Sequence, residues 1–329
     1  MQKRQLRIMG LFIGLFASLL LHAQDIHFSQ FYASPLTLNP ALTGNIESSC
    51  RAVLNVRDQW RTSDYEPFTT ISASYEKKGF LEKDNYGFGA VLVQDELPSF
   101  SYSGTRSYLS GAYHKNMGLH RLSAGLQVGL IYRNLADNKT YPVQYERLLG
   151  DYNSNLNNGE GSPSLTKTSM DFNVGIEWMA NYDFLSLHGG ISSFHLMRPD
   201  LSFYGGDKQP MNRLWIITAG AAYKLSEEWE LKPNIIYMYQ TASNKLHFGG
   251  GLEKKIEEGN WRFVNFSAYL RTSGAAIAIF GMGYRNFDFG FSYDFATKEN
   301  IAGAFELSII FNCNFDPELP DFYIPCNRY

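Results

Sequence analysis

The sequence has 329 residues, of which 44% are hydrophobic, 15% aromatic and 19% charged, and its formal net charge is −3. This amount of apolar surface excludes a disordered chain, and the slightly acidic balance excludes a nucleic-acid-binding surface. The chain contains three cysteines, Cys50, Cys313 and Cys326, which are too few for a disulfide-stapled scaffold.

The first 23 residues have the pattern of a secretory signal peptide. Basic residues at positions 3, 4 and 7 precede an apolar run, and Leu21-His22-Ala23 forms the cleavage site. We predict a signal peptide over residues 1–23, cleaved between Ala23 and Gln24. Its loss removes three of 29 Lys and Arg and none of 32 Asp and Glu, so the mature charge would be −6. No later apolar stretch reaches the roughly 18 to 20 residues of a membrane-spanning helix, which excludes a helical membrane protein.

The dominant pattern after residue 49 alternates apolar and polar residues. In Phe287–Phe295 the five odd positions are aromatic, whereas Asp288, Gly290, Ser292 and Asp294 occupy the even positions. A period of two places the two sets on opposite faces of a β-strand. Such runs reach the 9 to 11 residues or so of a tilted transmembrane strand, beyond the usual soluble strand of about 5 to 6. The sequence therefore predicts an all-β, antiparallel transmembrane β-barrel of the outer membrane.

We predict fourteen strands, within a barrel domain over residues 50–315 that is followed by a C-terminal tail over residues 316–329. The connections after even-numbered strands are short, and the longest ones run over 134–169, 96–104 and 197–212. With a periplasmic N-terminus the long connections would lie outside the cell. The predicted strands are Arg51–Trp60, Pro67–Glu76, Tyr86–Asp95, Thr105–Lys115, His120–Arg133, Met170–Asn181, Phe184–Leu196, Arg213–Leu225, Glu230–Gln240, Leu246–Lys255, Trp261–Thr272, Ala275–Tyr284, Phe287–Ala296 and Ile301–Cys313.

Two features of the barrel stay open at this point. Inward polar residues could line an aqueous pore or form a closed, hydrogen-bonded lumen; they are Asp171, Asn173, Glu177, Asp288, Asp294 and Glu306. Cys313 and Cys326 could form a disulfide; the alternative, which we favour, is that Cys50 is simply a half-buried residue of the first strand.

The chain carries no motif that predicts an enzyme. The sequence lacks G-x-S-x-G, H-E-x-x-H, C-x-x-C, a Walker loop and G-x-G-x-x-G. Asp151, Asn153 and Asn155 have the spacing of a calcium loop, but Leu156 replaces its turn glycine and Ser162 its bidentate Glu. We therefore predict no catalytic residues, no metal, no cofactor and no small-molecule substrate.

The segment at 24–49 resembles a known family. It reads QDIHFSQFY from Gln24 and NPALTG from Asn39, and RDQW follows from Arg57. This text closely resembles the opening of the PorP/SprF family, outer-membrane proteins of the type IX secretion system of Bacteroidetes. The C-terminal residues resemble the family's Cys-Pro-Arg-Phe ending, with departures at Asn327 and Tyr329.

The resemblance implies an accessory role in protein secretion and gliding motility, in the outer membrane. Such a protein would help to export or anchor a large, adhesin-like surface protein through that protein's C-terminal domain, with other type IX secretion components and the lipid bilayer as partners. The alternative is a porin or diffusion channel. We treat residues 24–49 as a periplasmic segment against the barrel mouth, and the 134–169 loop as the surface for the exported protein. The candidate partner contacts are Phe28, Gln30, Tyr32, Asn39 and Pro40 in the segment, and Tyr141, Tyr145, Arg147 and Tyr152 in the loop.

Overall fold

The computed structural model describes most of the chain after residue 26. Its described residues are 27–61, 66–80, 83–135, 145–146, 151–153, 156, 166–203, 208, 210–241, 243–256, 259–297 and 303–313. The predicted cleavage site at Ala23 and Gln24 and the tail at 316–329 lie outside them.

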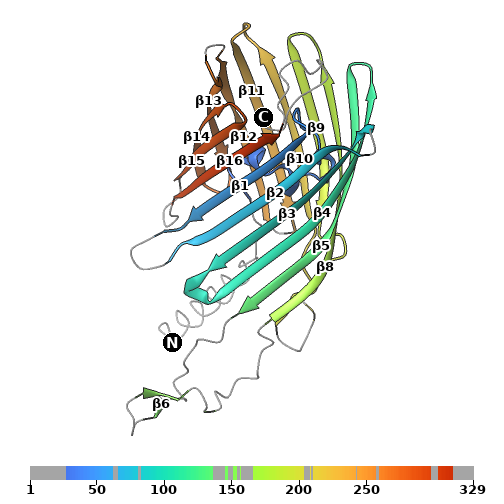
Figure 1. Cartoon of the computed structure of the whole chain (residues 1–329). Coiled ribbons are helices and arrows are strands. Elements are labelled where there is room, and N and C mark those ends of the chain that lie inside the picture. The colour runs from blue at the N-terminus through green and yellow to red at the C-terminus, as the bar shows by residue number, and fades with distance from the viewer. Residues whose placement is uncertain are drawn as a thin grey trace, which may run out of the picture.

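Fourteen strands form one closed antiparallel barrel, as the alternation predicts (Figure 1). Neighbours in sequence pair throughout, and β1 pairs with β16 to close the ring. Residues 145–146 and 151–152 form a separate two-stranded hairpin, β6 and β7. The barrel strands are β1 (Cys50–Gln59), β2 (Phe68–Phe80), β3 (Lys83–Leu97), β4 (Tyr102–Met117), β5 (His120–Leu135), β8 (Thr166–Asn181), β9 (Leu185–Phe194), β10 (Leu214–Lys224), β11 (Trp229–Gln240), β12 (Ser243–Lys255), β13 (Trp261–Arg271), β14 (Ala275–Tyr284), β15 (Phe287–Ala296) and β16 (Ala304–Cys313).

The two ends of the barrel differ in their connections. We call one the turn end, where short connections at 81–82, 118–119, 182–184, 225–228, 256–260 and 285–286 join the strands. At the other, the loop end, lie the connections at 136–165 and 195–213. The predicted loop at 96–104 is shorter than expected, because β3 and β4 continue to Leu97 and from Tyr102, with the 3₁₀ turn η5 (Pro98–Phe100) between them.

The outward face of the barrel is apolar. In β15, for example, Phe287, Phe289, Phe291, Tyr293 and Phe295 are each between 38% and 54% exposed. So continuous an apolar surface is expected where the solvent is lipid rather than water. No helix in the described part of the chain has the length and apolar character to cross a membrane.

A disulfide joins the first and last strands. Cys50 and Cys313 face each other in the β1–β16 ladder, with their Cα atoms 5.0 Å apart. The pairing of Cys313 with Cys326 is therefore wrong, and Cys50, which we expect from the sequence to be a half-buried strand residue, is instead buried and disulfide-bonded. The pairing follows from barrel closure, which brings two residues 263 positions apart into one register.

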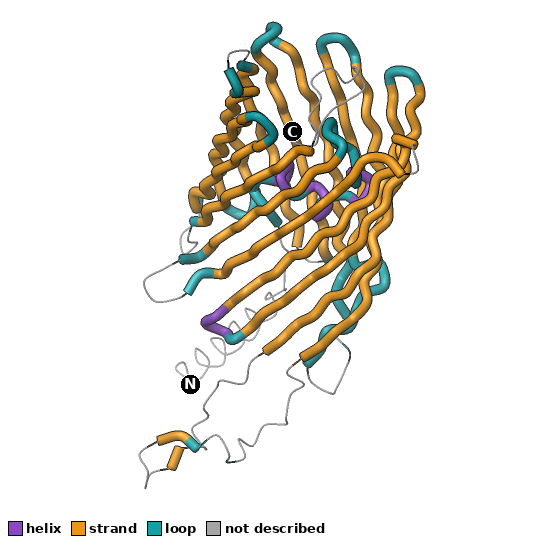
Figure 2. Tube along the Cα trace, in the orientation of Figure 1, coloured by secondary structure: helices purple, strands orange, loops and turns teal. Residues whose placement is uncertain are grey.

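The segment before β1 lies inside the barrel. Figure 2 shows its helical turns in purple, surrounded by the strands: η2 (Phe31–Ala33), η3 (Pro35–Thr37) and η4 (Pro40–Leu42). We call residues 27–49 the lumen segment. The sequence predicts this segment at the barrel mouth. The structure instead places it inside the barrel, where nearly all of its residues are buried.

Candidate functional site: a filled lumen

The lumen segment crosses the barrel from the loop end to the turn end. At the loop end, Nδ1 of His27 lies 3.2 Å from Nζ of Lys245, the third residue of β12. At the turn end, Ser49 leads into β1. The turns follow from the sequence, because Pro35 and Pro40 occupy first-turn positions where a missing N–H costs nothing. Asn39 caps η4 by accepting a hydrogen bond from the backbone N–H of Ala41 (3.0 Å).

Glu306 of β16 holds the segment at the loop end. Its carboxylate is fully buried and accepts the backbone N–H groups of Ser29 (2.8 Å) and Gln30 (3.0 Å). The same carboxylate accepts bonds from the side chains of Asn55 (2.9 Å) and Arg57 (3.0 Å) on β1. A buried carboxylate is stable only when several donors pair with it, as these four do. Glu306 therefore links the lumen segment to the β1–β16 pair that closes the barrel.

A second carboxylate continues this network. Asp294 pairs with Arg57 (2.8 Å) and with Arg271 (2.9 Å), and it accepts a hydrogen bond from the Ser29 hydroxyl (2.6 Å). Both guanidinium groups also donate to that hydroxyl oxygen at 2.8 Å. Two cations and two carboxylates therefore balance around Ser29. We call Arg57, Arg271, Asp294 and Glu306 the loop-end charge cluster.

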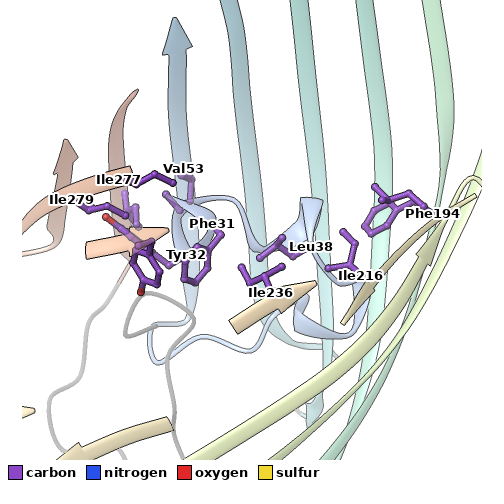
Figure 3. Close-up of a cluster of buried hydrophobic side chains, with 13 residues drawn as sticks. Phe31, Tyr32, Leu38, Val53, Phe194, Ile216, Ile236, Ile277 and Ile279 are labelled. Atoms are coloured by element: carbon purple, nitrogen blue, oxygen red, sulfur yellow. The ribbon is translucent and has the colours of Figure 1, made fainter. Parts of the chain in front are cut away.

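An apolar cluster lies beside the charges, within the lumen. Phe31, Tyr32 and Leu38 of the segment pack against inward side chains of the wall, which Figure 3 shows. Phe31 makes edge-on ring contacts with Tyr269 (centroids 5.5 Å apart) and His247 (5.6 Å). The wall contributes Val53, Phe194, Leu214, Ile216, Ile236, Ile277, Ile279 and Ile310.

Side chains of β5, β8 and β9 bind the middle of the segment. Gln127 donates to the carbonyl of Leu36 (2.8 Å), and Ser192 donates to the carbonyl of Leu38 (2.5 Å). Asn39 donates through its amide to Glu177 (2.9 Å). Backbone groups outside regular structure are thereby satisfied by the wall, as burial requires.

A third set of contacts lies toward the turn end. Arg51 pairs with Glu76 at 2.5 Å, and Glu76 also accepts the backbone N–H of Gly44 (2.9 Å). The hydroxyls of Thr43 and Ser110 are in contact, and the carbonyl of Thr43 lies 2.9 Å from His114 Nε2. The segment is therefore fixed by hydrogen bonds at both ends and in the middle.

Glycines in the wall make room for the segment. A Cβ at Gly125 would collide with the backbone of Pro40, and one at Gly175 would collide with the Asn39 side chain. Gly44, at φ +70°, packs directly against Gly87 of β3, where neither residue has space for a side chain. The wall and the segment are thus shaped to each other.

The lumen is closed and hydrogen-bonded in the region that the structure describes. The six inward polar residues identified from the sequence are all at most 4% exposed. A small cavity of about 40 Å³ beside Thr37, Arg106 and His195 has room for only a few water molecules. Of the two alternatives for the lumen, the structure therefore shows the closed one.

The structure separates the predicted contact residues into two groups. Phe28, Gln30, Tyr32, Asn39 and Pro40 are buried in the lumen. In the loop, Tyr145 is 44% exposed and begins β6, and Tyr152 ends β7, whereas Tyr141 and Arg147 lie outside the described residues.

Sequence reasoning missed the pairing of the segment with the wall. One signal was available: Ile277, Ile279 and Ile310 occupy inward positions that a water-filled lumen would make polar.

Two solved structures show the same fold at low identity. The CymD monoaromatic hydrocarbon channel is 13% identical with a TM-score of 0.51, and the alignment covers 91% of this chain and 96% of that chain. The TodX monoaromatic hydrocarbon channel deltaS2 mutant is 12% identical with a TM-score of 0.53, covering 84% and 93%. Likeness at this level establishes the barrel fold and nothing of its function.

No curated protein matches the sequence. A family model, described as type IX secretion system membrane protein PorP/SprF, matches residues 20–311. This match spans the lumen segment and the barrel from β1 to residue 311, within the last strand β16. The resemblance of the N-terminal motif is thereby confirmed, and the chain belongs to the PorP/SprF family of type IX secretion membrane proteins, as a β-barrel of the outer membrane.

Proposed function

We propose that this protein is an accessory barrel that helps to export or anchor a large, adhesin-like surface protein through that protein's C-terminal domain. The family match associates the protein with the type IX secretion system. The filled lumen is the observation that favours an accessory role over transport through the barrel. A barrel whose interior is packed with its own chain offers partners its rim and loops rather than a pore. No step in this role requires catalysis by the protein.

The porin alternative gains no support from the lumen. Solute passage would require breaking the bonds of Glu306, Gln127 and Glu177 to the lumen segment. In planar bilayers the intact protein should give no stable ion conductance. A steady open channel would favour the porin function.

We also propose that the loop-end connection over 136–165 faces the exported protein. It is the longest connection between barrel strands, and Tyr145 within it is exposed. Aromatic side chains at such positions commonly anchor interfaces. Phe28, Gln30, Tyr32, Asn39 and Pro40, in contrast, have the proposed role of closing the lumen.

The test is carried out in the native host. Deleting the gene should remove specific large surface proteins from the cell surface, measured by mass spectrometry of surface-labelled proteins. Deleting Asp151–Gly161 should leave the barrel folded and heat-modifiable on gels while lowering the same surface proteins. An unchanged surface proteome in the gene deletion would contradict the proposed function, and an unchanged one in the loop deletion alone would contradict only the loop's role.

A further inference from the structure

The barrel wall has an open strand edge at the loop end. β8 pairs with β5 from Thr166 to Ala180, but with β9 only from Val174 to Asn181. One further backbone bond, from the N–H of Leu196 to the carbonyl of Phe172 (3.0 Å), ends the contact on that side. Beyond Phe172, none of the residues that the structure describes forms a strand beside β8.

β9 ends where its chain turns away from β8. His195 has φ +58°, a left-handed conformation that few non-glycine residues adopt. Its backbone N–H donates to the Asn173 side chain (2.9 Å), and its ring nitrogen Nδ1 lies 2.7 Å from the Asp171 carboxylate. These contacts fix the turn at His195, so side chains of this chain determine that β9 ends there and leaves part of β8 without a neighbouring strand.

The hydrogen-bond pattern shows which groups face the open edge. In an antiparallel strand, alternate residues direct both backbone groups to the same side. Even-numbered residues of β8 face β9, because Phe172 accepts from Leu196 and Tyr182 donates to Leu185 (2.9 Å). Thr168 and Met170 therefore direct their N–H and C=O groups toward the open edge. Both are exposed, Met170 to 61%.

The sequence around the edge indicates that its outer part, at Thr168, lies in water, whereas Met170 adjoins the apolar outward surface with Leu109 and Leu130. Residues 166–169 read Thr-Lys-Thr-Ser, a polar stretch at the loop end of an otherwise apolar outward face. Unpaired backbone groups are too costly in hydrocarbon but tolerable in the water layer above it. Natural sheets usually cover or shorten such edges, because an open edge recruits another strand.

We propose that the β8 edge at Thr168 and Met170 binds an extended segment of the exported surface protein by β-strand addition. Backbone hydrogen bonds would supply the affinity, and Met170 would contact an apolar side chain on the outward face of the added strand. A second copy of this chain does not fit. Two upright barrels with strands tilted by about 35–45° would cross their edges at roughly 70–90°. The inference rests on the proposed function, because that function supplies the partner.

The first test uses Thr168→Pro, with Thr168→Ala as the matched control. Proline removes the N–H that faces the open edge and leaves the β5–β8 ladder intact, because Thr168 does not donate toward β5. In the gene-deletion strain, Thr168→Ala should restore the surface proteins lost on deletion. Thr168→Pro should leave them reduced about tenfold at equal levels of heat-modifiable barrel, the effect of losing one interchain hydrogen bond and its neighbours. Full restoration by Thr168→Pro would overturn the edge proposal while the proposed function stands.

The second test does not depend on the proline variant folding. The purified wild-type barrel in lipid nanodiscs is mixed with the C-terminal domain of a surface protein that the deletion strain loses, and amide hydrogen exchange is followed by mass spectrometry. Peptides that contain Thr168 and Met170 should exchange at least about tenfold more slowly with the domain bound. Unchanged exchange at this edge, with binding demonstrated, would overturn the proposal. If the deletion strain loses no surface protein, the proposed function fails and the edge proposal fails with it.

Discussion

The two faces of the same strands are built for different surroundings. On the outward face of β16, Leu307, Ile309 and Phe311 are each between 39% and 50% exposed and require only apolar contact. On the inward face, Glu306 forms four specific hydrogen bonds, two of them to the lumen segment. Lipid tolerates any apolar side chain of suitable size, whereas the hydrogen bonds in the lumen fit only the lumen segment in its observed position. Substitutions should therefore lower the stability of the barrel far more on the inward face than on the outward face.

The largest expected effect follows from removing the lumen segment. A variant that lacks residues 27–45 loses the chain that fills the barrel, and water should enter among the remaining polar side chains. We expect a heat-modifiable barrel that conducts ions in planar bilayers, whereas the intact protein does not. A folded variant with no conductance would show that another part of the chain closes the lumen.

The next effect compares neighbours on opposite faces of β16. Glu306→Ala leaves Arg57 buried without one of its two carboxylates, and it frees two backbone N–H groups of the segment. The free energy of unfolding should fall by about 3–5 kcal/mol. The outward control Leu307→Met should change it by less than about 1.5 kcal/mol. Urea unfolding in detergent, followed by tryptophan fluorescence, measures both, and equal losses would contradict the distinction between the faces.

A smaller effect is expected from the covalent link of the first and last strands. Replacing both Cys50 and Cys313 with Ser opens a loop that spans 263 positions. The free energy of unfolding should fall by about 2–4 kcal/mol, because the unfolded chain regains the freedom that the disulfide removes. The same urea titration measures it, with and without reductant on the wild type. Insensitivity of the wild type to reductant would contradict the prediction.

The smallest effect compares two wall glycines. Gly175→Ala places a methyl group against the Asn39 side chain, so the segment must shift, at a cost of about 1–3 kcal/mol. A methyl group at Gly111 of β4 meets nothing closer than 3.9 Å, so Gly111→Ala should be nearly neutral. Equal effects of the two substitutions would show that the segment does not press against the wall at Gly175.

The sequence allows the barrel to be predicted but not its filling. All fourteen strands are predicted, with bounds close to those observed, because alternation over about ten residues is a local property of each strand. The position of residues 27–49 depends on contacts such as Ser29 with Asp294, which are 265 residues apart. Local patterns contain no such information. The same holds for Cys50 and Cys313, which only ring closure makes neighbours.

Inward isoleucines were the one local sign of the filled lumen. Ile277 and Ile279 alternate with alanines in β14, so both faces of this strand are apolar. A strand with lipid on one side and water on the other would not have this composition. An apolar inward stripe is therefore a usable signal of a packed lumen in related sequences.

The most direct test of the filled lumen is a cross-link between the segment and the wall. Thr43 and Ser110 have hydroxyls in contact and both are buried, so the double variant Thr43→Cys/Ser110→Cys replaces two small side chains with thiols that face each other. In intact cells we predict an internal disulfide, detected as a linked pair of peptides by mass spectrometry, whereas the single variants should give none. Two thiols that stay free and react fully with an alkylating reagent would contradict the account.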